Sequence, residues 1–217
     1  MRIFVIGASG RVGKALVRKL LNAGHEVTGT TRSDSLVFNH NSYSQLKMDI
    51  TSPLDDIEAC IPVDTDVVYF TTGSTGKNIL QVDLYGAVKC MQAAEKKGIK
   101  RFIHLSALFS LRPEKWKSII DYYIGKHFSD LYLINQTKLD YTIVQPGYLS
   151  EEKPKGKVET DDAKMKIEDS VSIEDVAEVM SFIIDKPGTF KSVIPVITGE
   201  LPIYKAINST IKRINDN

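Results

Sequence analysis

The chain has 217 residues, and its 28 Lys and Arg residues nearly balance 27 Asp and Glu residues, for a formal net charge of +1. Hydrophobic residues make up 42% and charged residues 25% of the sequence, which excludes a disordered, collagen-like or low-complexity chain. So small a net charge gives no electrostatic reason to expect a nucleic acid or an anionic membrane surface as partner. The length fits a single domain spanning residues 1–217.

The sequence also carries expectations about compartment and metals. No stretch approaches the roughly 20 apolar residues of a membrane span, and no signal-peptide pattern follows Met1. Cys60 and Cys90 are the two cysteines of the chain, too few for a disulfide framework, so we expect a cytoplasmic protein. His40 and His127 have no Cys, Asp or His at metal-ligand spacing, and no metal site is predicted.

Short apolar runs alternate with segments of helical periodicity from the start of the chain. This pattern predicts strands at residues 2–6, 27–31, 45–48, 66–70, 100–105, 141–144 and 193–197. It predicts helices from Val12 to Gly24 and at residues 53–60, 77–97, 114–137, 173–184 and 203–214. Apolar strands that alternate with helices indicate parallel strands covered on both faces, and right-handed crossovers then give a doubly wound, Rossmann-type α/β sheet. Residues 147–171 and 187–217 are expected to form a small C-terminal substrate cap.

A glycine-rich loop directly follows the first predicted strand and opens the first predicted helix. Its sequence is Gly7-Ala8-Ser9-Gly10-Arg11-Val12-Gly13. The first glycine permits a tight turn, the second lets a diphosphate approach the backbone, and the third lets the helix pack closely on the strand. The helix N-terminus adds unpaired N–H groups and a partial positive charge. In this setting the loop predicts dinucleotide binding, with a purely structural turn as the alternative.

The end of the second predicted strand indicates which dinucleotide is bound. An acidic residue there would bind a ribose 2′-hydroxyl, whereas an arginine accommodates a 2′-phosphate. The strand here ends in Thr31-Arg32-Ser33, and the Arg32 guanidinium can pair with phosphate. We therefore expect NADP as the cofactor, contacted by Arg32 and Ser33. NAD is the alternative, because Asp34 follows closely enough to compete.

At this point the sequence resembles the short-chain dehydrogenase/reductase superfamily, in particular its small atypical members, which are known as NmrA-like or sugar-nucleotide epimerase-like NAD(P)-binding proteins. Besides the glycine loop, the resemblance rests on Lys47-Met48-Asp49-Ile50, Val67–Gly73, Gly98–Ser106, Leu139–Gly147 and Ser172–Ala177. Family members more often carry arginine at the position of Gln145, so no ion pair is carried over there.

The resemblance also implies roles for individual residues in binding the cofactor. Asp49 would contact the adenine, with Ile50 beside it. Thr71, Thr72 and Gly73 would line the dinucleotide, and Pro146 would border the nicotinamide together with Gly147.

The same superfamily uses a serine and a Tyr-x-x-x-Lys motif for proton exchange. Ser106 ends a predicted strand, and Tyr122 and Lys126 share one face of a predicted helix because they lie four residues apart. The resemblance implies that Tyr122 exchanges a proton with the substrate oxygen, that Ser106 hydrogen-bonds that oxygen, and that Lys126 holds the nicotinamide ribose. A phenol has a pKa of about 10, and a nearby ammonium is expected to lower it. Tyr123 could replace Tyr122 by a small shift of register.

These observations predict an NADP(H)-dependent oxidoreductase that transfers a hydride to a small carbonyl, quinone or flavin-like acceptor. A sugar-nucleotide epimerase or dehydratase is the first alternative, although roughly 70 residues beyond Pro146 leave little room for a nucleotide sugar. The second alternative is an NADP-sensing regulator that binds the cofactor without turnover and acts on a protein partner. A small-molecule substrate is expected in the enzyme readings, and a homodimer is compatible with the sequence.

Overall fold

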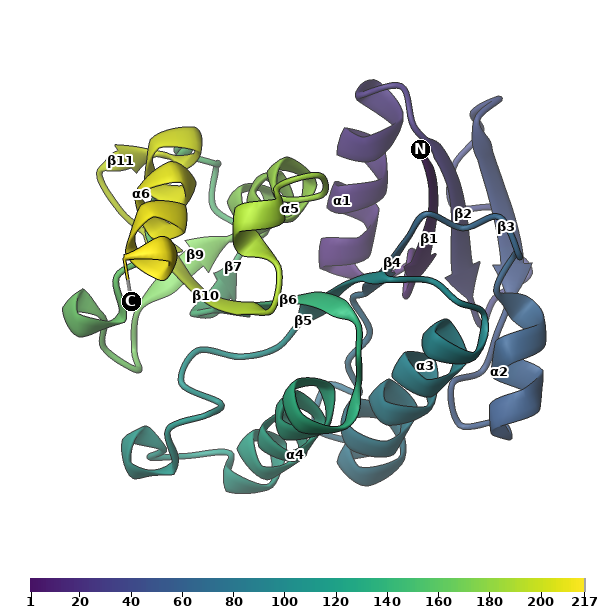
Figure 1. Ribbon diagram of the computed structural model, residues 1–217, viewed down its shortest axis with the longest axis horizontal. Coiled ribbons are helices and arrows are strands. Elements are labelled where there is room, and N and C mark those ends of the chain that lie inside the picture. The colour runs from purple at the N-terminus through teal and green to yellow at the C-terminus, as the bar shows by residue number, and fades with distance from the viewer. Residues whose placement is uncertain (217) are drawn as a thin grey trace.

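The computed structural model describes residues 1–216 (Figure 1). The strands are β1 (Arg2–Ile6), β2 (Glu26–Thr31), β3 (Tyr43–Lys47), β4 (Val67–Phe70), β5 (Arg101–Leu105), β6 (Asp140–Pro146), β7 (Tyr148–Ser150), β8 (Lys157–Glu159), β9 (Ser170–Ser172), β10 (Ser192–Thr198) and β11 (Leu201–Pro202). The α-helices are α1 (Arg11–Asn22), α2 (Leu54–Cys60), α3 (Tyr85–Lys96), α4 (Ile120–Gln136), α5 (Ile173–Phe182) and α6 (Ile203–Asn215). A π-helical turn η1 (Ile79–Leu84) precedes α3, and three 3₁₀ turns are η2 (Pro113–Lys115), η3 (Asp162–Lys164) and η4 (Pro187–Thr189).

The central sheet has nine strands in the order β11-β8-β10-β6-β5-β4-β1-β2-β3, and β7 pairs with β9 in a separate small sheet. The strands from β3 to β10 run parallel, while β8 and β11 are antiparallel to their neighbours. The predicted doubly wound α/β fold is therefore confirmed. The strand order reverses beside β1, which pairs with β2 on one side and β4 on the other. In such folds ligands bind outside the carboxyl ends of the strands at this point.

Helices cover both faces of the sheet. In Figure 1, α1 and α5 lie above the sheet, and α2, α3 and α4 lie below it. Because side chains alternate along a strand, β1 contributes to both cores: Ile3 and Val5 pack on the side of α1, while Phe4 and Ile6 pack on the side of α3. β1 is thus buried on both faces, as the apolar run predicts.

Two predicted helices begin later than the sequence pattern suggests. The helix predicted over 77–97 starts at Ile79 with the π-helical turn, which places the Asp83 carboxylate where the backbone N–H of Ser74 donates to it, 3.1 Å away. The helix predicted over 114–137 starts at Ile120, because Ile119 takes a left-handed conformation with φ of 46° and interrupts the chain there. The loop 106–119 is consequently longer than expected.

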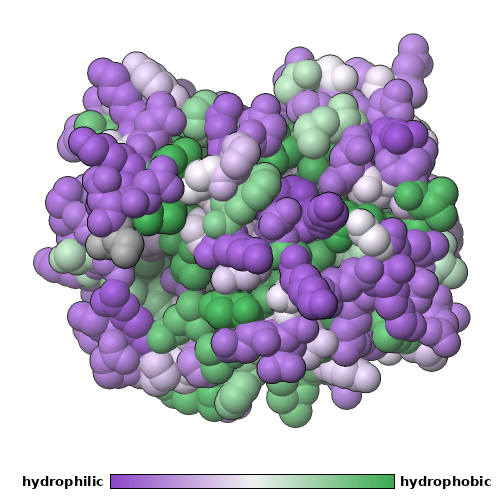
Figure 2. Space-filling view, viewed as in Figure 1, coloured by the Kyte–Doolittle hydropathy of each residue, from purple (hydrophilic) through white to green (hydrophobic). Residues whose placement is uncertain are grey.

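The segments expected to form a cap are divided between several elements. Residues 147–171 supply β7, β8 and part of β9. Residues 187–217 supply β10, which extends the parallel sheet beside β6, and then β11 and α6. Figure 2 shows one face of the molecule with a mostly hydrophilic surface and scattered apolar side chains. Within residues 1–216, no helix is long and apolar enough to cross a membrane.

A buried arginine ties the C-terminal half of the fold to the sheet. The Arg101 guanidinium, on β5, donates to the carbonyl oxygens of Ile183 (2.9 Å) and Ile184 (3.2 Å) at the end of α5, and of Asp140 (2.8 Å) at the start of β6. It also donates to the Thr142 hydroxyl at 2.8 Å. Burial lowers the pKa of Arg101 to about 10, so the group remains a cation near neutral pH.

Candidate functional site

The glycine loop has the geometry that its sequence predicts. Gly7 takes a φ of +88°, a conformation that disfavours side chains, and a Cβ there would lie 2.4 Å from the Thr72 hydroxyl. A Cβ on Gly13 would lie 2.1 Å from the Gly7 carbonyl oxygen. These distances confirm the tight turn at Gly7 and the close helix–strand packing at Gly13.

The N-terminus of α1 is prepared for an anion. Its N-cap residue, Gly10, supplies no side chain, and the first turn of the helix holds no acidic residue. The backbone N–H groups of this turn are therefore without a side-chain partner, and the helix dipole adds partial positive charge. The loop and helix start thus fit the diphosphate of a dinucleotide.

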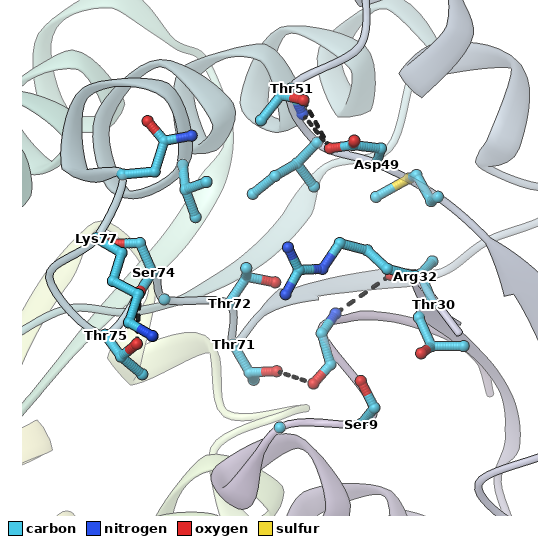
Figure 3. Close-up of a pocket in the computed structure, with 18 residues that line it drawn as sticks. Ser9, Thr30, Arg32, Asp49, Thr51, Thr71, Thr72, Ser74, Thr75 and Lys77 are labelled. Atoms are coloured by element: carbon cyan, nitrogen blue, oxygen red, sulfur yellow. Dashed lines mark hydrogen bonds between the residues drawn. The ribbon is translucent and has the colours of Figure 1, made fainter. Parts of the chain in front are cut away.

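A cavity of about 550 Å³ opens at the carboxyl ends of β1, β2 and β4 (Figure 3). The structure brings nine of the predicted cofactor residues to its wall: Gly7, Ser9, Gly10, Arg32, Asp49, Ile50, Thr71, Thr72 and Gly73. The other predicted residues lie outside its lining: Arg11, Val12, Gly13, Ser33, Lys126 and Pro146. Sequence reasoning missed further lining residues: Thr30, Thr31, Met48, Thr51, Ser74, Thr75, Lys77, Asn78 and Val82. Most of these directly precede or follow a residue that was predicted, so the carboxyl ends of the strands were the usable signal.

The charged groups in this first cavity suit a 2′-phosphate. Figure 3 shows the Arg32 side chain extending into the cavity from the end of β2. Asp34, the acid that could compete for a ribose hydroxyl, is paired with the Lys47 ammonium at 3.0 Å. Asp49 accepts hydrogen bonds from the backbone N–H and the hydroxyl of Thr51, at 2.9 and 2.8 Å, and these lower the pKa of its carboxyl group.

A second cavity, of about 250 Å³, lies on the other side of the glycine loop. Ser106 and Tyr122 meet in its wall, and Arg11 joins them from the start of α1. The remaining lining is largely apolar or aromatic: Ala107, Leu108, Ile119, Tyr123, Pro146, Gly147, Tyr148, Leu149 and Ile167. Ile167 comes from the segment 147–171, whereas no lining residue found in the described chain comes from 187–216.

Lys126 lies behind this second cavity and not in its wall. Its side chain is 3% exposed, and its ammonium donates to the carbonyl oxygen of Leu105 at 3.1 Å and lies 4.0 Å from an oxygen of Asp83. The ammonium is 5.9 Å from the ring centre of Tyr122. Burial lowers the pKa of Lys126, while Asp83 and Asp130 act in the opposite direction.

The expectation that Lys126 lowers the pKa of Tyr122 is wrong. Burial raises the pKa of the Tyr122 phenol, and the negative charges of Asp83 and Asp130 raise it further. The ammonium has little effect because Asp83 lies closer to it than the tyrosine ring does. Tyr122 is therefore a neutral phenol near pH 7, able to donate a hydrogen bond.

Tyr123 lines the same cavity and stays a candidate beside Tyr122. Its ring stacks on Trp116, with centres 5.5 Å apart and planes inclined by 19°. Burial raises the pKa of Tyr123 to about 12. Neither tyrosine is held as a phenolate at neutral pH.

Ser106 is connected to a buried carboxylate that the sequence did not single out. The Ser106 hydroxyl donates to Oδ2 of Asp130 at 2.6 Å, and the Ser110 hydroxyl donates to the same oxygen at 2.5 Å. The Gln145 amide donates to the Ser110 oxygen at 2.6 Å. Nε2 of His104 lies 3.3 Å from Oδ1 of Asp130. An acid at the helical spacing Lys126–Asp130, i and i+4, was the signal in the sequence.

Fold and site together define a Rossmann-type NAD(P)-binding protein. Over residues 7–187 the sequence matches the NAD(P)H-binding family, and the chain belongs to that family. Its structural neighbours include atypical short-chain dehydrogenase/reductase and epimerase-like oxidoreductases.

Several relatives resemble the chain over nearly its whole length. The oxidoreductase YlbE of Lactococcus lactis is 39% identical, with a TM-score of 0.90 over 98% of this chain and 97% of that one. The Bacillus subtilis protein described as the uncharacterized sugar epimerase YhfK is 31% identical over 95% of this chain and 99% of its own. A short-chain dehydrogenase/reductase from Veillonella parvula, solved in complex with NADP, shares the fold with 19% identity and a TM-score of 0.72 over 93% of this chain and 96% of that one.

Proposed function

We propose that the protein is an NADP(H)-dependent oxidoreductase that reduces a small carbonyl, quinone or flavin-like acceptor in the second cavity. The observation that carries the proposal is the placement of two cavities on either side of one glycine loop. Gly10 lines the first cavity, while its neighbour Arg11 lines the second. A cofactor in the first cavity would therefore lie next to an acceptor in the second.

Each group of residues has a distinct task in this proposal. The backbone amides at the start of α1 hold the diphosphate, and Arg32 pairs with the 2′-phosphate. The bound cofactor supplies hydride chemistry. Ser106 and Tyr122 hydrogen-bond the acceptor oxygen and stabilise the negative charge that develops on it.

The size of the second cavity favours a small acceptor over a nucleotide sugar. Its volume of about 250 Å³ is below the roughly 300–1,000 Å³ that is typical of pockets for drug-sized ligands. An epimerase acting on a nucleotide sugar would need a larger space. The sensor alternative predicts NADP binding with no oxidation of NADPH by any acceptor.

Replacing Arg32 with alanine tests the choice of cofactor. We expect calorimetry to show NADPH binding weakened about tenfold to a hundredfold, because a charge-assisted hydrogen bond contributes about 1.5–3 kcal/mol. NADH binding should change little, since it carries no 2′-phosphate. Arg2→Ala, at the opposite end of the sheet, is the matched control and should bind both cofactors normally. Equal losses for NADPH and NADH in Arg32→Ala would contradict the assignment to NADP.

Replacing Tyr122 with phenylalanine tests the assignment of the acceptor site. We expect kcat for NADPH oxidation to fall about a hundredfold, as when one donor to a developing oxyanion is removed. NADPH affinity should be retained, because Tyr122 lines the second cavity alone. Tyr123→Phe is the comparison: a larger loss there would transfer the role to Tyr123. The exposed Tyr204→Phe on α6 is the matched control.

A further inference from the structure

Four titratable side chains form a buried cluster behind Ser106. Asp83, His104 and Asp130 are each 0% exposed, and Lys126 is 3% exposed. They come from three elements: η1, β5 and α4. Ser106 connects this cluster to the second cavity, because its oxygen contacts Asp130 while its residue lines the cavity wall.

The charges in this buried cluster do not balance when each carboxyl group is ionised. Asp83 and Asp130 would carry two negative charges against the single positive charge of Lys126. Gln145 is neutral and adds no cation. An uncompensated buried charge is costly, and such sites commonly take up a proton instead. The cluster therefore needs one additional proton, on Asp130, on His104 or shared between them.

Unpartnered atoms indicate where this proton belongs. Oδ1 of Asp130 and both ring nitrogens of His104 are buried and have no aligned hydrogen-bond partner among the described residues. Oδ1 and Nε2 nevertheless lie 3.3 Å apart. A proton on either atom would give both of them a partner after a small rotation of the ring.

The surroundings of the pair decide which of its members carries the charge. His104 faces Asp130 and Lys126 from α4, Asp83 from η1, and the Phe70 ring from β4 at 5.3 Å. Burial lowers the pKa of His104 more strongly than Asp130 raises it. A full imidazolium is therefore disfavoured, and the carboxyl group is the better site for the proton.

We propose that Asp130 and His104 together store one proton, which Ser106 passes to the acceptor in the second cavity. This inference rests on the proposed function for the identity of the reaction. The Ser106 O–H bond breaks as its proton moves to the acceptor oxygen. The proton of Asp130 then moves to Ser106, leaving a carboxylate, while the two electrons arrive as hydride from NADPH. After the product leaves, the cluster takes a proton back from solvent through Ser106.

Tyr122 is the less suitable source of this proton. Loss of its proton would create a phenolate beside the carboxylates of Asp83 and Asp130, which raise the pKa of the phenol. Tyr122 can donate a hydrogen bond to the acceptor oxygen and still keep its proton. Asp130 and His104 act through Ser106, so both are positioning and proton-supplying residues and do not contact the acceptor.

The first test needs no turnover. Infrared spectra of the full chain at pH 7, with NADPH in one sample and without it in another, should contain a protonated-carboxyl band that disappears in Asp130→Asn. Nitrogen-15 NMR should show a neutral His104 ring whose signal shifts in the same variant. An ionised Asp130 together with a neutral His104 in the wild type would overturn the proposal, because no proton would then be stored.

The second test uses NADPH oxidation with menadione, a naphthoquinone, as the probe. Asp130→Asn and Ser106→Ala should each lower kcat about tenfold to a hundredfold with NADPH affinity retained, the scale of a lost proton-transfer group. The double variant should be no slower than Ser106→Ala alone, because Asp130 acts through Ser106. The pH dependence of kcat should also flatten in Asp130→Asn. Independent losses that multiply, or a wild-type pH profile in Asp130→Asn, would overturn the proposal.

Ser129→Ala is the matched control for these variants. Its hydroxyl is buried beside Asp130 on α4 and donates to the Lys126 carbonyl oxygen, at 2.9 Å, away from the second cavity. It should keep wild-type kcat and the carboxyl band. If an Asp130 variant fails to fold, Ser106→Ala and His104→Gln provide the same infrared comparison. Absence of NADPH binding in the wild type would refute the proposed function, and the infrared and NMR spectra would still decide whether the proton is stored.

Discussion

Gly13→Val is expected to weaken NADPH binding more than about a hundredfold, a loss of roughly 3 kcal/mol. The reason is the 2.1 Å that would separate any Cβ at this position from the Gly7 carbonyl oxygen. A backbone atom cannot move aside as a flexible side chain can, so α1 must shift away from β1. The amides that hold the diphosphate then lose their alignment. Calorimetry with NADPH measures the affinity, and urea unfolding should show a stability loss of about 3 kcal/mol.

Lys14→Val is the matched control for this prediction. It introduces the same side chain into the next position of α1, where the residue is exposed. Its cost should be limited to a few tenths of a kcal/mol of helix propensity. A Gly13→Val protein that binds NADPH as tightly as Lys14→Val would refute the role of the glycine loop and, with it, the proposed function.

Arg101→Met is expected to destabilise the protein by about 3–5 kcal/mol, the cost of breaking a buried charged network. The substitution keeps an unbranched side chain but removes every donor. The carbonyl oxygens of Ile183, Ile184 and Asp140 then remain buried without the partner that they have in the wild type. Urea unfolding monitored by circular dichroism measures the change.

Arg18→Met is the matched control for this stability prediction, since it removes an arginine from the surface. Arg18 pairs with Glu174 at 2.9 Å, but its side chain is 54% exposed. Exposed ion pairs contribute about 0–1 kcal/mol, so this variant should remain close to the wild type. Similar losses in both variants would show that Arg101 does not hold α5 to the sheet.

The fold and the first cavity were largely predictable because local patterns specify them. Apolar runs such as Arg2–Ile6 can be buried on both faces in a parallel sheet, and the glycines at 7 and 13 answer to contacts within one strand–loop–helix unit. Arg32 was predictable for the same reason, since it ends a strand whose neighbour carries the loop. Local sequence was sufficient wherever the partners are adjacent in the fold's known topology.

The second cavity and the buried cluster depend on contacts that no local pattern records. Asp130 meets Ser106 across 24 positions of sequence, and Lys126 is neutralised by Asp83, which lies on a different element. The Tyr-x-x-x-Lys spacing correctly places both residues on one helix but says nothing of the acids around them. The sign of the Tyr122 pKa shift was therefore wrong at the sequence level, because it is set by burial and by distant charges.

The adjacent positions of Gly10 and Arg11 on the two cavity walls limit how this protein can diverge. The wall that carries Arg11 belongs to the unit that grips the diphosphate, so substitutions in that backbone endanger cofactor binding as well. New acceptor preferences must therefore arise from the opposite wall, at residues 119–123, 146–149 and 167. Relatives that share the dinucleotide grip can thus act on different acceptors by changing a few side chains there.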